Sequence, residues 1–156
     1  MKLDRLHRLT PSRPPIQRTE WSPAITLDMA RLAELLDAPT HHSLHFLDLE
    51  TGRIIRPAPG EAIPGAHEKY DVQDERYIAI TPWGQTEALN IREQFLLTAP
   101  ILTRSLLRSA LDSRKPLRTF DRAVMEHIDL RPLWQAFLAE EVKLWLAQHD
   151  LEPAPL

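Results

Sequence analysis

The chain has 156 residues and a formal net charge of −3. A chain of this length is expected to form one domain, and its negative charge provides no global attraction for nucleic acid or membranes. The absence of cysteine excludes disulfides, thiolate chemistry and cysteine-based zinc sites, and it fits the cytoplasm as the expected compartment.

Residues 1–25 are expected to form an extended N-terminal arm. The segment holds four of the fourteen prolines, and its five basic and two acidic side chains give a net charge of +3. It is interpreted either as a disordered leader or as an arm that docks on its own domain or on a partner, with Trp21 as anchor. No apolar run fits a signal peptide or a membrane span, so we expect no membrane contact.

The first ordered elements are predicted to be a helix and a hairpin. Thr26 is a good N-cap for a helix over Leu27–Asp37, which Pro39 ends. Strands over Ser43–Glu50 and Arg53–Arg56 then flank a turn, where Gly52 is expected to adopt a positive φ.

A long connection follows over residues 57–75, and a third strand is predicted over Arg76–Ile80. The remaining chain is predicted to be helical, in four segments: Glu87–Ala99, Ile101–Leu111, Phe120–His127 and Leu133–His149. In the last helix, which Asp129 is expected to cap, the stripe of Trp134, Phe137 and Trp145 is typical of a buried core face.

The predicted fold class is therefore α+β. A small antiparallel sheet of about three strands is packed by four or five helices, and the C-terminal half is all-helical. Residues 26–150 are expected to form the single domain, and residues 151–156 a C-terminal tail.

Several short motifs follow one another along the chain: Leu47-Asp-Leu-Glu-Thr-Gly52, Arg76-Tyr-Ile-Ala-Ile-Thr-Pro82, Arg92-Glu-Gln-Phe95 and Leu117-Arg-Thr-Phe-Asp121. In this order they resemble a small bacterial family that is classed only as an uncharacterised protein family. The resemblance covers roughly residues 27–150 and implies the fold, but it supplies no catalytic residues. The family turn before the last helix reads Phe-Arg-x-Phe-Lys, so Leu117 and Asp121 depart from it and weaken an inherited basic site.

Two groups of residues are candidates for acid–base or metal chemistry. Asp48 and Glu50 share one face of a predicted strand, where paired carboxylates suit acid–base work or a hard cation; Arg53 and Arg56 are their expected cross-hairpin partners if the pair is structural. The histidines of the motif His41-His-Ser-Leu-His45 lie where a helix is not expected, so no metal site is predicted. No cofactor is expected either, because no glycine-rich phosphate loop is present.

A basic segment over residues 104–122 is the candidate binding surface. Its members are Arg104, Arg108, Arg114, Lys115, Arg118 and Arg122, with Phe120 among them. Such a patch suits phosphate or single-stranded nucleic acid. Alternatively, it is a solvated face whose arginines pair with acidic residues 71–75 or with Glu140 and Glu141. Asp112 and Asp121 within the segment make binding to nucleic acid weak.

These patterns favour a non-catalytic binding or adaptor protein of regulatory or immunity type. It is expected to contact another protein through the 57–75 loop, the N-terminal arm or an edge strand. The alternatives are a nucleic-acid or phosphate binder that uses the 104–122 segment, and a carboxylate-dependent enzyme at the hairpin. The sequence does not indicate the oligomeric state.

Overall fold

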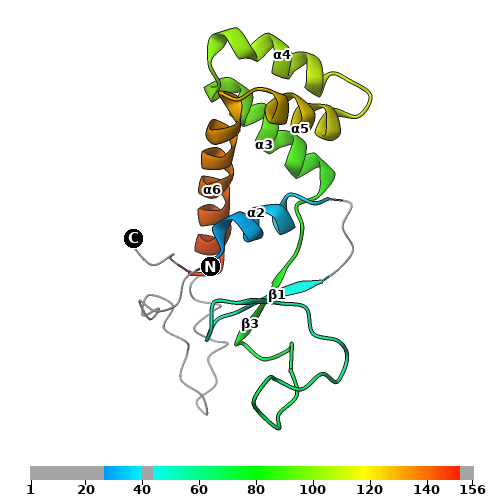
Figure 1. The fold of residues 1–156 in the computed structure, drawn as a ribbon, viewed down its shortest axis with the longest axis vertical. Coiled ribbons are helices and arrows are strands. Elements are labelled where there is room, and N and C mark those ends of the chain that lie inside the picture. The colour runs from blue at the N-terminus through cyan, green and yellow to red at the C-terminus, as the bar shows by residue number, and fades with distance from the viewer. Residues whose placement is uncertain (1–26, 40–43, 152–156) are drawn as a thin grey trace, which may run out of the picture.

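The computed structural model describes residues 27–39 and 44–151 (Figure 1). The elements in chain order are α2 (Met29–Leu36), β1 (His45–Asp48), β2 (Ile54–Ile55), β3 (Tyr77–Ile80), α3 (Gln85–Thr98), α4 (Ile101–Leu111), α5 (Pro116–Glu126) and α6 (Leu130–Gln148). The sheet and its long loop lie at one end of the molecule and α3, α4 and α5 at the other, while α6 runs from the helical end towards the sheet. The predicted α+β class is confirmed.

The three strands form an antiparallel sheet in the order β2-β1-β3. Phe46 lies opposite Ile55 and Ala79, and Asp48 lies opposite Tyr77. The strands are shorter than predicted, and Ser43 lies outside the described residues. All four residues of β1, the central strand, are buried. Residues 57–75 contain no strand, as expected, apart from an isolated bridge between Ala62 and Lys69.

Gly52 has a φ of 75° in the turn between β1 and β2, so the predicted positive φ is confirmed. A branched side chain is strained in this region. Gly52→Val should therefore lower the free energy of unfolding by more than about 1 kcal/mol. Urea denaturation tests this against Gly52→Asn, because asparagine tolerates a positive φ better than a β-branched residue does. An equal effect of the two variants would contradict the strain argument.

Two predicted helix starts are wrong. The N-cap of α2 is Asp28, whose Oδ1 accepts a hydrogen bond of 2.9 Å from the Arg31 amide, whereas Thr26 lies outside the described residues. Helix α5 begins at Pro116 and not near Phe120, because the fixed φ of proline suits the first helical position, where no amide donor is needed. Asp129 does occupy the N-cap position of α6, but its side chain makes no capping hydrogen bond.

The core forms where α6 packs against α2, α3 and α5, and it confirms the predicted stripe. Trp134, Trp145 and Leu146 are buried, and Phe137 packs partly buried against them. The Trp134 ring meets the rings of Phe95 and Phe120 edge to face, with centroids 5.1 and 5.0 Å apart. Leu151, which the sequence analysis assigned to the tail, is also buried in this core.

Candidate functional site

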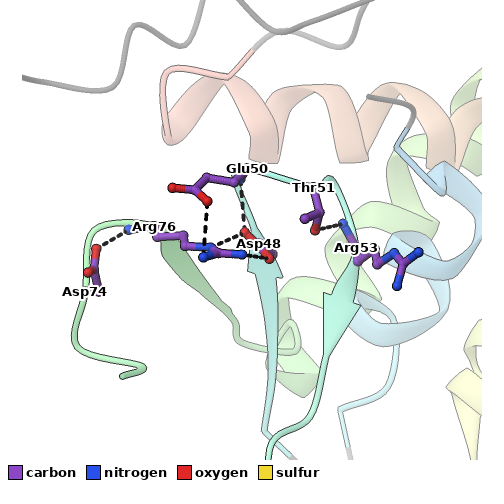
Figure 2. A network of polar contacts seen from close by, with 6 residues as sticks. All are labelled: Asp48, Glu50, Thr51, Arg53, Asp74 and Arg76. Carbon is purple, nitrogen blue, oxygen red and sulfur yellow. Dashed lines mark hydrogen bonds and ion pairs between the residues drawn. The ribbon is translucent and has the colours of Figure 1, made fainter. Parts of the chain in front are cut away.

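The two hairpin carboxylates converge on an arginine that the sequence analysis did not assign to them (Figure 2). Arg76 precedes β3, and the antiparallel register brings it beside the end of β1. Its Nε and Nη2 donate hydrogen bonds of 2.8 Å to the two carboxylate oxygens of Asp48. Its Nη1 lies 3.1 Å from Glu50 Oε2. The expected partners are wrong: Arg53 points away from both carboxylates in Figure 2, and Arg56 makes no ion pair with the described residues.

Asp48 is held in its ionised form by these contacts. Burial raises the pKa of Asp48, but the bidentate bonds from Arg76 and the bond of 3.0 Å from the Glu50 amide outweigh it and lower the pKa below the usual value. Hydrogen bonds to Asp48 likewise raise the pKa of Arg76. A carboxylate so fully engaged is a poor general acid, so the arrangement fits a structural tie between β1 and β3 better than catalysis.

The depressed pKa of Asp48 predicts acid sensitivity. A carboxyl group with a lower pKa in the folded than in the unfolded state contributes stability above the unfolded value, and this contribution is lost as the pH falls through the folded pKa. The urea midpoint of the wild type should therefore drop more steeply between pH 6 and pH 3 than that of Asp48→Asn. Parallel pH profiles for the two proteins would contradict this assignment.

The histidine motif is only partly described. His41 and His42 lie outside the described residues, and His45 is buried in β1. Among residues 27–39 and 44–151, no group of three histidine or carboxylate side chains is placed to hold a metal ion.

The basic segment divides into two parts on α4 and α5. Arg104 donates to the Ala99 carbonyl (2.9 Å), and Arg108 makes a bidentate pair with Glu93, so the expected partners in residues 71–75 and at Glu140 and Glu141 are wrong. Phe120 is 0% exposed and lies in the core, which removes it as a stacking surface. The other members are exposed and form no ion pair with the described residues: Arg114, Lys115, Arg118 and Arg122.

A second polar network was missed by the sequence analysis because it joins three distant segments. Arg92 on α3 is 1% exposed, and its guanidinium bonds both oxygens of Asp37 (2.9 and 2.7 Å), Asp121 Oδ1 (2.9 Å) and the Ala88 carbonyl (3.0 Å). The same group lies 5.2 Å from the centroid of the Trp134 ring. The only local signal was an arginine on the apolar face of a predicted helix.

The Asp37 and Asp121 ends of this network border a groove of about 620 Å³ between α2, α5 and α6. We call it the α2–α5–α6 groove. Its wall includes Met29, Val124, Trp134 and Leu138, and all its charged lining residues are acidic: Glu34, Asp37 and Asp121. Burial raises the pKa of Asp37, although Arg92 counteracts this effect.

Large apolar side chains are exposed where α3 ends, where α4 begins and just after α5 ends. Helices α4 and α5 run antiparallel (Figure 1), and a hollow between them is lined by Leu106 in the middle of α4 and by His127 just after the end of α5. Four exposed large apolar side chains lie at the α3–α4 junction and between α5 and α6. We call them the apolar corner: Leu97, Ile101, Leu102 and Ile128.

The sequence model of the Uncharacterised protein family (UPF0158) matches residues 22–154, which is most of the chain. The chain belongs to this family. The match spans both polar networks, the groove and the apolar corner of the UPF0158 fold. It begins after residue 21, so most of the basic N-terminal segment precedes it.

A curated relative is the Pseudomonas aeruginosa protein named UPF0158 protein PA5073. The two proteins are 29% identical over 136 residues, which cover 83% of this chain and 87% of the relative. No solved structure matches this UPF0158 chain. The expected resemblance to a bacterial uncharacterised family is thereby confirmed. No helix of the described residues is long and apolar enough to cross a membrane.

Proposed function

We propose that this protein is a non-catalytic cytoplasmic binding module that docks another protein on its apolar corner. The observation that carries the proposal is the exposure of three large apolar side chains at the start of α4 and between α5 and α6. Leu102 is 96% exposed, Ile101 76% and Ile128 73%. Exposed apolar side chains that together form a contiguous surface mark protein-binding sites on soluble domains.

The 57–75 loop supports this role less well than the apolar corner. Its larger apolar side chains, Ile63, Tyr70 and Val72, are half-buried, and the residues around them are mainly polar. At the corner, by contrast, Leu97 is the second-last residue of α3 and Ile101 is the first residue of α4, and both side chains are exposed. Burying such side chains against a partner gains about 25 cal/mol per Å² before the costs of association.

The test compares full-length wild type with the double variant Leu102→Glu/Ile128→Glu, each immobilised and exposed to lysate of the native host. Leu144→Glu is the matched control, because Leu144 is also an exposed leucine but lies near the far end of α6. The proposal expects specific proteins on wild type and Leu144→Glu that are depleted about tenfold on the double variant. Equal capture by all three would refute it, provided that circular dichroism shows folded proteins.

A second candidate function is binding of a phosphate-bearing ligand or nucleic acid. It is favoured by Arg114, Lys115, Arg118 and Arg122, which lie around the start of α5 without ion pairs to the described residues. The patch is smaller than the predicted one, because Arg108 is paired and Phe120 is buried. These four cations can neutralise only a few phosphates.

Nucleic-acid binding should therefore be weak and steeply salt-dependent. Each neutralised phosphate contributes a slope of about −0.9 in log affinity against log salt on duplex DNA, so binding seen at about 50 mM salt should fade by about 200 mM. Fluorescence anisotropy with labelled single- and double-stranded oligonucleotides measures this. A sub-micromolar dissociation constant at about 150 mM salt, abolished by Arg118→Ala/Arg122→Ala, would rank this function first.

A further inference from the structure

The α2–α5–α6 groove has the size and the chemistry of a peptide site. Its volume of about 620 Å³ lies within the range of binding pockets. Its apolar wall includes Val124 and the buried ring of Trp134. An occupant of this groove would need an apolar group for the wall and a positive charge for the rim.

The rim keeps a net negative charge even though it contains ion pairs. Asp37 and Asp121 share a single guanidinium, that of Arg92, so two carboxylates face one positive charge. Arg92 is buried beneath them, and its two Nη atoms donate to these carboxylates and to the Ala88 carbonyl. Glu34 pairs with Arg31, but this contact is solvent-exposed and therefore weak.

The N-terminal segment of the same chain meets both requirements. Residues 1–26 carry five basic and two acidic side chains, a net charge of +3, together with Trp21 and several leucines and isoleucines. They join the described structure at Leu27, and α2 begins at Met29, which itself lines the groove. Charge complementarity and direct continuity of the chain thus single out this segment.

The lengths also agree. The groove follows α2 from Met29 to the C-cap Asp37, which is eight residue steps and about 12 Å along the helix. An extended chain rises about 3.3 Å per residue, so roughly four residues cover this length after a reversal near Leu27. Trp21 lies six residues and Arg18 nine residues before Leu27, so the intervening chain is long enough for both side chains to reach the groove.

We propose that the α2–α5–α6 groove binds the protein's own N-terminal segment, with Trp21 against the apolar wall and Arg18 at the acidic rim. The segment then covers the groove in the free protein, and any other basic, apolar peptide must displace it. The groove shares no residue with the apolar corner, so a failure of this proposal does not affect the proposal for the apolar corner.

Engineered cysteine pairs test the proposal directly, because the natural chain has none. Ser22→Cys is combined with Gln135→Cys, an exposed position on the groove wall. The matched control combines Ser22→Cys with Glu140→Cys, which is exposed on α6 but lies about 140° around the helix. Disulfide formation under mild oxidation is followed on non-reducing gels, and the linked peptides are identified by mass spectrometry.

The groove pair should close within one chain about tenfold faster than the control pair, because docking raises the effective concentration of the thiols. Adding Trp21→Ala or Arg18→Glu to the groove pair should remove most of this advantage. Equal rates for the two pairs would overturn the proposal. Disulfides between chains that increase with protein concentration would do so too, and would make a second copy the source of the bound segment. Gln135 and Glu140 are exposed, and thermal unfolding checks that each protein is folded.

Discussion

Replacing Trp134 with alanine should lower the free energy of unfolding by about 3–5 kcal/mol, a large fraction of the 5–15 kcal/mol that is typical of a domain. Trp134 is buried at the centre of an aromatic cluster, with edge-to-face contacts to Phe95 and Phe120 and a stacked contact to Phe137 at 6.1 Å. Alanine would leave a cavity between three helices that rigid neighbours cannot fill. Trp145→Ala should cost a similar amount, because Trp145 is equally buried.

Urea denaturation followed by circular dichroism measures both effects without relying on the fluorescence that the substitutions remove. Leu144→Ala is the control, since Leu144 is an exposed neighbour on the same helix and should change stability by less than about 0.5 kcal/mol. Unchanged midpoints for both tryptophan variants would show that α6 is not part of the core.

Features set by local sequence were predicted well. The bounds Ile101–Leu111 of α4 agree with the structure, because its apolar spacing and the preceding proline are local signals. The turn at Gly52 was found for the same reason, since a single glycine stands between two β-rich runs. Strand lengths were overestimated because the pattern of alternating residues continues beyond the residues that pair.

Features set by tertiary contacts were not predicted. In the sequence, Phe120 lies among basic residues and resembles part of a linker. In the structure, Phe120 lies on the buried face of α5, while the neighbouring Arg118 and Arg122 are exposed at the surface. Arg76 is 28 residues from Asp48, and only the β1–β3 register brings the two together. The candidate surfaces therefore emerged from the packing of the helices, whereas the sequence indicated only the residue types.

Replacing Arg92 with methionine should destabilise the fold by about 3–5 kcal/mol, because removal of one partner leaves a buried charge uncompensated. Methionine fills much of the space, so the effect reports the lost charge more than a cavity. Asp37 would lose its two bonds to Arg92 and keep the desolvation that already raises its pKa. Arg31→Met is the control: Arg31 makes an exposed ion pair with Glu34, which is worth about 0–1 kcal/mol.

The pH dependence separates this electrostatic effect from a packing defect. Without Arg92, the pKa of Asp37 in the folded state should rise further above the unfolded value, so the folded state binds the proton more tightly than the unfolded state does. Such a group adds stability at low pH that is lost as the pH rises through the folded pKa. The deficit of Arg92→Met should therefore be smaller at pH 5 than at pH 8, and Asp37→Asn in the same background should recover part of it at pH 8. A deficit that is independent of pH and unaffected by Asp37→Asn would mean that Arg92 acts through packing against Phe120 and Trp134, and not through its charge.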